Sequence, residues 1–190
     1  MRSKHVRIVT YTGVMIAIAL LFQSLRLVFP GLAIINFFGV SLLQIIIGTL
    51  VNLCLLITLW NVGLVSGLLL SALAPVVAFM QGQAPIPHMI AVIALGNAVY
   101  CLIAWVPFAK AKTRFFLTMV AALSKFGLMA LLVLKLVIPV LLPAAVTSAP
   151  KVDAITAALS VNFVWPQLIN AVIGGLLAYT ISPRLPKAAE

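Results

Sequence analysis

Acidic side chains are almost absent from this chain. The sequence has 12 Lys and Arg residues but only 2 acidic ones, Asp153 and Glu190, and neither lies in a long apolar run. Membrane pumps driven by protons or sodium ions usually carry a carboxylate inside the bilayer. The composition therefore excludes a self-powered pump of that kind, and also headgroup transferases that use several Asp residues. If the chain moves a solute across a membrane, we expect another protein to supply the energy.

Signatures of catalysis and of covalent crosslinking are also missing. The sequence has no GxxxxGK[ST] phosphate loop, no HExxH pair and no cluster of metal-ligating side chains. Its two cysteines, Cys54 and Cys101, lie in apolar runs without a CxxC spacing, which is typical of small buried side chains. The two histidines lie near opposite membrane faces. We therefore expect no enzymatic activity, no metal and no cofactor.

What the chain has in abundance is hydrophobic sequence. Of its 190 residues 65% are hydrophobic and 7% are charged, and the mean hydropathy is +1.30. Soluble domains carry about 25% charged residues. The composition predicts an all-α integral membrane protein with one domain, 1–190. The net charge of +10 comes from basic residues at the ends of apolar runs, which indicates contacts to anionic lipid and excludes a nucleic-acid-binding patch.

Apolar runs long enough for membrane spans are separated by turn signals. A spanning helix needs about 20 mostly apolar residues. Pro30-Gly31 ends the first run, and residues 61–63 form a minimal turn between the second and third. A cleaved signal peptide over 1–33 is the alternative for the first run, which is however too long and lacks a cleavage site. The six predicted helices are 8–29, 36–60, 64–80, 88–108, 115–142 and 154–181.

The loop charges predict the orientation. With six spans, both termini share one side, and nearly all loop cations fall on that side, whereas the opposite loops hold only Lys151. Cytoplasmic loops of membrane proteins carry the excess of Lys and Arg. We therefore expect both termini in the cytoplasm. The cations on the side of the termini are Arg2, Lys4, Arg7, Lys110, Lys112, Arg114, Arg184 and Lys187.

Lys125 is the most costly residue to place in a membrane. It lies about 16 Å along the fifth helix from Arg114, near the middle of a core about 30 Å thick. Its burial there costs about 2.5–3.5 kcal/mol on insertion scales. Two interpretations follow, a ligand contact or buried network, and a side chain that escapes along a groove. Arg26 and Lys135 lie nearer the outer ends of their helices, where they either snorkel or hold an anionic group.

The sixth helix combines polar and aromatic groups around a proline. Pro166 lacks the N–H that would bond the carbonyl of Asn162, and its ring clashes with that carbonyl. A free carbonyl, the Asn162 amide and the Trp165 indole together favour a small polar heteroaromatic ligand. The alternative is a kink healed by neighbouring helices and water. Gln167 and Asn170 follow on the same helix.

The fourth helix supplies further candidate ligand contacts. His88 lies at its outer end, and Asn97 and Tyr100 follow one turn apart. Asn97 near mid-membrane needs a partner on another helix or on a ligand. On the second helix, Gln44 and Asn52 share a face and are interpreted as interhelical hydrogen-bonding groups. Gln81 and Gln83 belong to an outer loop that is either solvated or closes over a pocket.

The first helix carries a small-xxx-small pattern. Gly13 and Ala17 are four residues apart in a run of larger side chains. Small residues at this spacing let a second helix approach closely. The pattern indicates either packing within the bundle or a docking face for another membrane protein.

These features together resemble the substrate-binding S component of energy-coupling factor (ECF) vitamin transporters. The resemblance covers the whole chain as an architecture of six helices without acids or ATPase motifs. Its motifs are GxxxA at Gly13 and Ala17, similar to the family's AxxxA, and the Pro-rich loop 81–87 ahead of a helix with Gly96-Asn97. The resemblance implies docking through the first helix on a transmembrane coupling subunit (T component) with two ATP-binding cassette ATPases, and toppling of the subunit in the bilayer.

The resemblance also implies an outward-facing vitamin site on helices four to six in a prokaryotic plasma membrane protein. A hydroxymethylpyrimidine or pyridoxine-like ring fits Trp165 with Asn97 and Asn162, whereas pantothenate or another carboxylate requires cations. The clustered amides and indole favour the ring. Two other classes stay open, a self-sufficient channel or facilitator and a scaffold without a ligand. The full set of candidate substrate contacts is Arg26, His88, Asn97, Tyr100, Lys125, Lys135, Asn162 and Trp165.

Overall fold

The computed structural model describes residues 2–37, 39–106 and 111–187, and these fold almost entirely into helices. One short antiparallel hairpin, with Asn36 paired to Ser41 and Phe37 to Val40, interrupts them. The elements in chain order are α1 (Arg2–Val28), the 3-10 helix η1 (Pro30–Ile34), β1 (Asn36–Phe37), β2 (Val40–Ser41), α2 (Leu42–Asn61), α3 (Leu64–Met80), α4 (His88–Ala104), α5 (Ala111–Leu132), the π-helix η2 (Val133–Leu141), α6 (Leu142–Ala145), α7 (Ala149–Asn162), α8 (Trp165–Ile181) and the 3-10 helix η3 (Ser182–Arg184).

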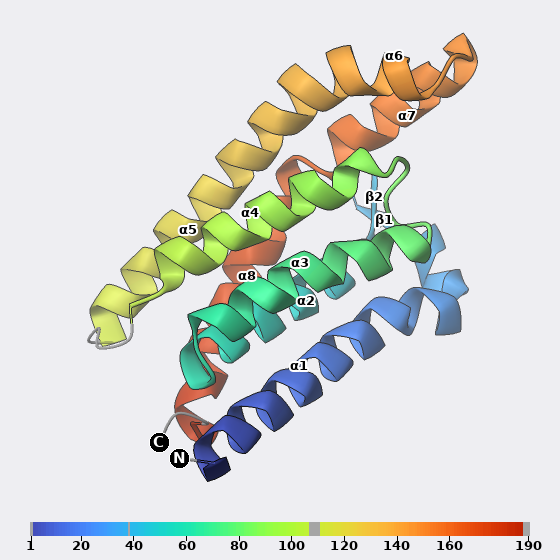
Figure 1. Ribbon diagram of the computed structural model, residues 1–190. Coiled ribbons are helices and arrows are strands. Elements are labelled where there is room, and N and C mark those ends of the chain that lie inside the picture. The colour runs from blue at the N-terminus through green and yellow to red at the C-terminus, as the bar shows by residue number, and fades with distance from the viewer. Residues whose placement is uncertain (1, 38, 107–110, 188–190) are drawn as a thin grey trace.

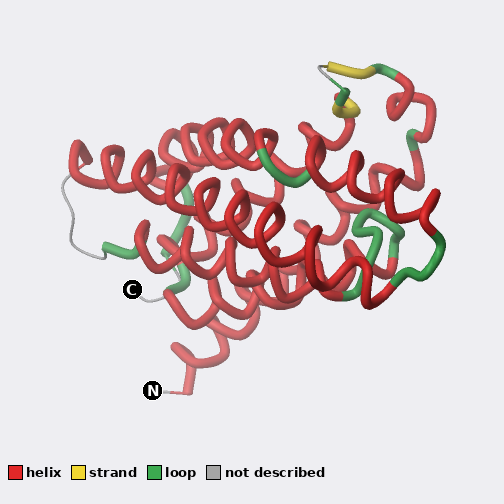
Figure 2. The backbone as a smooth tube through the Cα atoms, turned by 90° about the horizontal axis from the view of Figure 1, so that it is seen from above, coloured by secondary structure: helices red, strands yellow, loops and turns green. Residues whose placement is uncertain are grey.

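The long helices form a closed ring with one helix outside it. In order around the ring, α2 packs against α8, α8 against α5, α5 against α4, α4 against α3, and α3 against α2. The first helix, α1, lies outside this ring against α2 and α3 (Figure 1). Viewed from above, the β1–β2 hairpin lies at the edge of the helical body (Figure 2). A ring of five helices leaves an interior that side chains from every member reach.

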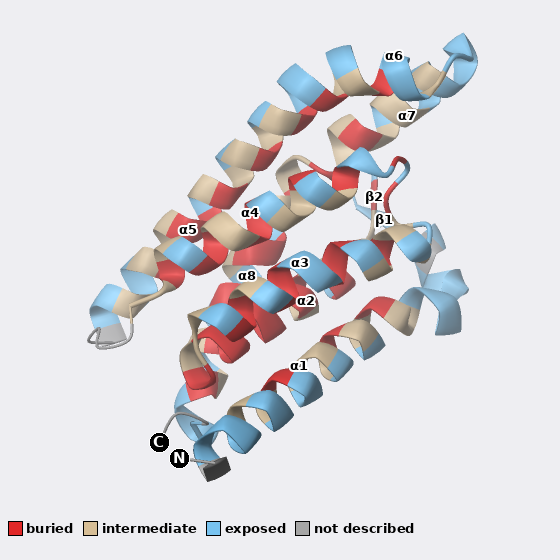
Figure 3. Cartoon of the chain, in the orientation of Figure 1, coloured by how far each residue is buried: buried red, intermediate tan, exposed pale blue. Residues whose placement is uncertain are grey.

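Burial is concentrated on α2 and on the facing sides of its neighbours, whereas α1 shows mostly exposed and half-buried residues (Figure 3). The buried apolar residues form two clusters. One gathers α2 with parts of α3, α4, α5 and α8, and includes Leu55, Leu56 and Leu59. The other joins α4, α5, η2 and α7, and includes Met129 and Leu159. The candidate site lies where these two clusters meet.

Glycines bring α2 and α8 into close contact. A Cβ on Gly174 would lie 2.6 Å from the Thr49 carbonyl oxygen and 2.8 Å from the Asn52 Cβ. A Cβ on Gly48 would collide with the amide of Asn170. Because contacts to backbone atoms cannot be relieved by a rotamer change, only glycine fits at position 174 in this packing. This approach places the polar side chains of α2 and α8 against the same interior space.

Both ends of the described chain lie at one end of the bundle (Figure 1). The Arg7 guanidinium Nη2 donates a hydrogen bond to the Lys187 carbonyl oxygen at 3.1 Å. Lys112 and Arg114, at the start of α5, lie at this same end, as the loop charges predict. Lys110 falls outside the described residues. We call this the basic end, and the opposite end, with the hairpin and the α3–α4 loop, the far end.

Four helical segments are long and apolar enough to cross a membrane: Lys4–Val28, Leu42–Asn61, Lys112–Ala145 and Ala149–Arg184. Two of these segments, α5–η2–α6 and α7–α8, are composite. Two further apolar helices, α3 and α4, have 17 residues each. The predicted bounds of the third helix, 64–80, and the predicted start of the fourth at His88 are confirmed. α4 ends at Ala104, short of the predicted 108.

The second predicted helix, 36–60, begins too early. Residues 36–37 and 40–41 pair as strands β1 and β2, and α2 starts at Leu42. Gly39 has a φ of +80°, a left-handed conformation that allows the turn, and Val40 is fully buried beyond it. An apolar run does not by itself distinguish a strand from the first turn of a helix. The first helix starts at Arg2 rather than at residue 8, and it ends at Val28, before Pro30.

The sixth predicted helix, 154–181, is two helices rather than one kinked span. α7 ends at Asn162 and α8 starts at Trp165, with Phe163 and Val164 in non-helical conformation. Asn162 is the residue whose carbonyl Pro166 cannot bond, so the chain leaves the helix there and restarts with Pro166 near the N-terminus of α8. The fifth predicted helix, 115–142, is longer than expected, and its outer third is the π-helix η2, which contains Pro139.

Candidate ligand-binding site

A fully enclosed lysine lies at the centre of the ring. Lys125, on α5, is 2% exposed. Its Nζ donates hydrogen bonds to Asn52 Oδ1 on α2 at 2.7 Å and to Asn97 Oδ1 on α4 at 2.8 Å. The interpretation that the side chain escapes along a groove between helices is therefore wrong, and the interpretation as a buried network is confirmed. Three helices converge on one ammonium group.

The surroundings of this ammonium hold the Asn52 amide in position and add an aromatic face. Asn52 Nδ2 donates to the Gly48 carbonyl oxygen at 2.7 Å, which turns Oδ1 toward the lysine. The Tyr100 ring centroid lies 5.4 Å from Nζ, within the range of a cation–π contact. The Tyr100 hydroxyl in turn donates to the Ala171 carbonyl oxygen on α8 at 2.6 Å. Oxygen dipoles and an aromatic face thus solvate the cation without a carboxylate.

The lysine network forms one wall of a cavity of about 90 Å³. The walls come from α1, α2, α3, α4, α5 and α8 and from the loop after α3. Its volume is below the range of about 300–1,000 Å³ of drug-sized ligand pockets, so a larger ligand requires the walls to move. The aromatic residue in the lining is Phe163. The polar residues in the lining are Gln23, Gln44, Asn52, Gln83, Asn97, Lys125, Gln167 and Asn170.

Two buried acceptors of this lining lack a hydrogen-bond donor among the described residues. Gln23 Oε1 and Asn170 Oδ1 are both unpaired, and their residues are 3% and 2% exposed. Gln23 is anchored through Nε2, which donates to the Ala74 carbonyl oxygen on α3 at 2.9 Å. A buried acceptor without a partner costs about 1–3 kcal/mol. Both groups therefore favour a bound molecule, or water, that donates to them.

The loop 81–87 closes the far end of the cavity. Gly82, with a φ of +69°, ends α3 by turning the chain back toward α1. Gln83 Nε2 then donates to the Gln23 carbonyl oxygen at 3.1 Å and to Gln81 Oε1 at 2.7 Å. Gln81 Nε2 donates to Ser24 Oγ at 3.1 Å. Of the two interpretations of this loop, the structure agrees with closure over a pocket.

An apolar layer separates the cavity from the basic end. Following α2 from Asn52 toward the basic end, Leu55, Leu56 and Leu59 are fully buried. Cys101 on α4 and Ala121 on α5 are equally buried on that side of the lysine network. The residues of α2 that line the cavity reach no further toward the basic end than Asn52.

The structure brings three predicted contacts together and leaves five outside the cavity. Asn97 and Lys125 line it, and Tyr100 supports the lysine from behind. Arg26 is exposed at the mouth, beside a small cavity that Gln44 and Gln83 also line. His88 and Lys135 are exposed and do not line the cavity.

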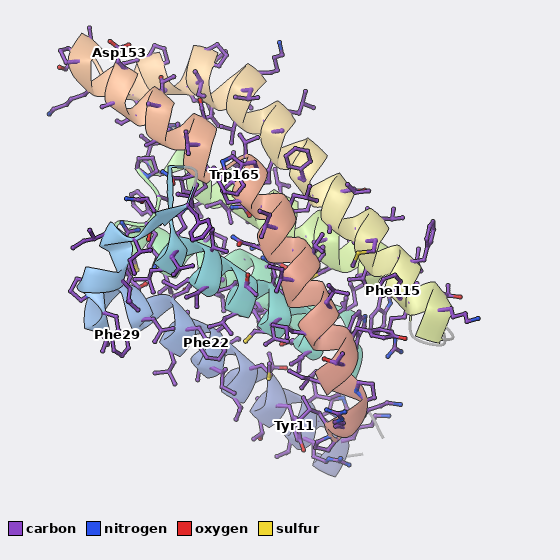
Figure 4. All side chains as sticks on the ribbon, turned by 180° about the vertical axis from the view of Figure 1, so that it is seen from behind. Tyr11, Phe22, Phe29, Phe115, Asp153 and Trp165 are labelled. Carbon is purple, nitrogen blue, oxygen red and sulfur yellow. The ribbon has the colours of Figure 1, made fainter. Side chains whose placement is uncertain are left out.

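The predicted ring-binding group at Asn162 and Trp165 does not form. The Asn162 carbonyl is free of its helix, as predicted, but it accepts a hydrogen bond from Gln44 Nε2 at 3.2 Å. Trp165 lies at the junction of α7 and α8 (Figure 4), and it is absent from the lining. Phe163 occupies the position expected for the indole, because the break in the helix turns residue 163 inward.

Sequence reasoning missed several amides of the lining as site residues. Gln44 and Asn52 were interpreted as interhelical groups, which their bonds to Asn162 and Lys125 confirm, yet they also line the cavity. Gln167 and Asn170, one turn apart on α8, and Gln23 on α1 line it as well. The available signal was the amide side chain inside an apolar run, which indicates an internal polar surface.

The small-residue pattern of α1 faces outward. Gly13 and Ala17 are both exposed, and a Cβ on Gly13 would meet no atom within 4 Å. The alternative that this pattern packs inside the bundle is therefore wrong. Exposed apolar side chains lie on the same helix at Val6, Val9 and Leu21. Contacts of α1 with the ring run instead through buried Thr12, whose Oγ1 lies 2.8 Å from Ser66 Oγ.

Among the described residues, acidic and metal-ligating side chains do not gather at the cavity. Within the described ranges no group of three or more His, Cys, Asp or Glu residues is placed to hold a metal ion. Asp153, the acidic residue that the structure describes, is exposed toward the tip of α7, well away from Trp165 at the start of α8 (Figure 4). Comparison with known protein families, curated proteins and solved structures gives no match for this chain.

Proposed function

We propose that this chain is the substrate-binding S component of an ECF-type vitamin importer. In this proposal six helices cross a prokaryotic plasma membrane, with α3 and α4 as the two shorter spans, and both termini lie in the cytoplasm. The protein captures a small vitamin or precursor from outside. It then delivers the vitamin inward together with a T component and two ATP-binding cassette ATPases.

The observation that carries the proposal is the amide-lined cavity around Lys125. Such a concentration of polar groups inside an apolar bundle is costly and marks a ligand or ion pathway in membrane proteins. The loop 81–87 covers this cavity at the end that the loop charges place outside. The apolar layer on the other side of the lysine disfavours an open channel, which needs a continuous polar path.

The outward face of α1 supports association with a partner. Gly13 and Ala17 are exposed small residues on a helix that packs outside the ring of five helices. Helices associate in membranes through small residues that allow close approach. The T component is the partner that this surface fits in the proposed importer, and the hydrolysis of ATP by the cassette subunits supplies the energy that the chain itself lacks.

Two classes of ligand remain within this proposal. A hydroxymethylpyrimidine or pyridoxine-like ring stacks on Phe163, with amide hydrogen bonds from Asn97 and Asn170. A carboxylate vitamin such as pantothenate pairs instead with Lys125. The heteroaromatic ligand loses two of its predicted contacts, since Asn162 and Trp165 lie outside the cavity lining. The carboxylate ligand keeps Lys125, its principal predicted contact.

The docking surface is tested by substitution of Gly13. We expect Gly13→Leu to leave ligand binding by the solitary subunit unchanged and to abolish vitamin uptake by reconstituted transporter, because the bulky side chain holds a partner helix away. Gly127→Leu is the matched control, since Gly127 is also exposed and a Cβ there would meet no atom within 4 Å, but it lies on α5. Loss of ligand binding in Gly13→Leu would count against the docking role.

Transport without ATPase partners distinguishes the proposal from its competitors. A channel or facilitator gives solute flux into liposomes that contain this chain alone. A scaffold shows no saturable solute binding, and substitutions in the cavity change only its stability. The importer subunit binds solute tightly alone and transports it only with the coupling module.

A further inference from the structure

The cavity holds a positive charge with no counter-charge in its lining. Lys125 is the charged residue of the lining, and the other polar members are amides. Asp153, the acid that the structure describes, is exposed on α7 and does not line the cavity. Burial of a cation is costly unless an anion pairs with it. An anion that pairs with Lys125 therefore has to come from outside the described residues.

The amides around Lys125 orient its charge without neutralising it. An ammonium group has three donors, and Asn52 and Asn97 accept two of them. The Tyr100 ring contributes its negative face from 5.4 Å. Amide oxygens and aromatic faces stabilise the cation locally, but the net charge of the cavity stays positive.

The start of α8 adds a second positive element. Val164, the N-cap of α8, makes no side-chain hydrogen bond to the first turn. Phe163 and Gln167, on either side of this N-terminus, both line the cavity. The dipole of α8 makes its N-terminus attractive to anions, although Pro166 has no N–H there and the Gln167 N–H already donates to the Val164 carbonyl oxygen at 3.2 Å. The same lining holds two buried acceptors, Gln23 Oε1 and Asn170 Oδ1, that have no described donor and require N–H or O–H groups on a bound molecule.

We propose that the ligand of this cavity is a carboxylate that also carries hydroxyl or amide N–H groups. Its carboxylate pairs with Lys125 near the start of α8, and its donors satisfy Gln23 Oε1 and Asn170 Oδ1. This inference rests on the proposed function and selects, from its two ligand classes, the carboxylate over the uncharged ring. A cationic ligand is excluded, because it would bring a second positive charge beside Lys125.

The first test compares charged probes with uncharged analogues of nearly the same shape. Isothermal titration calorimetry of the purified full chain measures pantothenate against panthenol and biotin against biotinamide, with hydroxymethylpyrimidine as the uncharged ring. We expect at least one carboxylate to bind, and its uncharged analogue to bind at least about tenfold more weakly, because the charge-assisted hydrogen bond is lost.

The second test supplies the counter-charge from the protein. Asn97→Asp is nearly isosteric and places a carboxylate at hydrogen-bond distance from Lys125 Nζ. We expect this variant to bind the carboxylate ligand at least about tenfold more weakly, since Lys125 is then already paired with a carboxylate. Its elution volume and thermal unfolding should still be those of a folded protein. Asn36→Asp, on the exposed β1 strand, is the matched control and leaves the affinity unchanged.

The outcomes separate this inference from the proposed function. Equal affinity for a carboxylate and its uncharged analogue, or an unchanged affinity in Asn97→Asp, overturns the proposal that the ligand carries a carboxylate. Tight binding of hydroxymethylpyrimidine alone also overturns it, yet agrees with a vitamin-binding subunit. Absence of saturable binding for every vitamin probe contradicts both the carboxylate and the binding subunit.

Discussion

The buried lysine shows how a single residue organises this molecule. From sequence alone, its position in mid-helix left two interpretations open, a ligand contact or buried network and a side chain that escapes along a groove, because a charge in the membrane is costly without partners. The identity of these partners did not follow from the sequence, since Asn52 and Asn97 lie 73 and 28 residues away along the chain. Only the packing of α2, α4 and α5 brings them to the same ammonium.

Gly174 tests the packing that positions this network. Gly174→Ala places a methyl group 2.6 Å from the Thr49 carbonyl oxygen, so α2 and α8 must separate. We expect a loss of about 1–3 kcal/mol in stability, seen as a lower unfolding temperature in detergent, together with weaker ligand binding. Gly127→Ala is the control, because its added methyl meets open space and only raises helix propensity. Equal stability of the two variants would show that the α2–α8 contact is looser than described.

At the scale of elements, hydropathy predicted the helices better than their interruptions. The long apolar runs predicted the bounds of the third helix and the start of the fourth. In lipid, backbone N–H and C=O groups must hydrogen-bond within the segment, so a long apolar run forms a helix. The β1–β2 hairpin and the break at Phe163 and Val164 escaped prediction. In both, a local backbone feature, Gly39 or Pro166, acts within an apolar run that composition cannot subdivide.

The loop after α3 joins the cavity lining to α1. Gln83 bonds the loop to α1 and lines the cavity. We expect Gln83→Leu to raise the dissociation rate of the ligand by about tenfold, because the loop loses its two hydrogen bonds to α1 and Gln81. Stopped-flow or filter-binding dissociation measures this rate. His88→Leu, a change at an exposed residue close to the same loop, should leave the dissociation rate unaltered. A similar rise in the dissociation rate of this variant would show that any disturbance near the loop has this effect, and not the loss of the Gln83 hydrogen bonds.

At the scale of the whole molecule, the distribution of charge predicts orientation. The chain ends meet at the basic end, where Arg7 bonds the Lys187 carbonyl, while Lys151 lies on α7 at the far end. Which end faces the cytoplasm is read from the positive-inside rule rather than from the packing. The sequence thus predicts the orientation, whereas the cavity between the helices required their arrangement in space.

Cysteine labelling in intact cells tests this orientation. Cys54 and Cys101 are buried, so the background is low. We expect a membrane-impermeant maleimide to label Lys151→Cys from outside and to reach Lys187→Cys only after the membrane is permeabilised. Labelling of position 187 in intact cells would show that the orientation is the opposite one, with the cavity mouth on the cytoplasmic side.

The most direct test of the whole account is the identity of what the solitary protein binds. The chain is purified without partners, and co-eluting small molecules are identified by mass spectrometry and titrated back by calorimetry. We predict one vitamin-like ligand at one copy per protein, carrying a carboxylate, with affinity lost in Asn97→Asp. A protein that elutes empty and ignores a panel of vitamins would contradict the binding subunit and favour a channel or a scaffold.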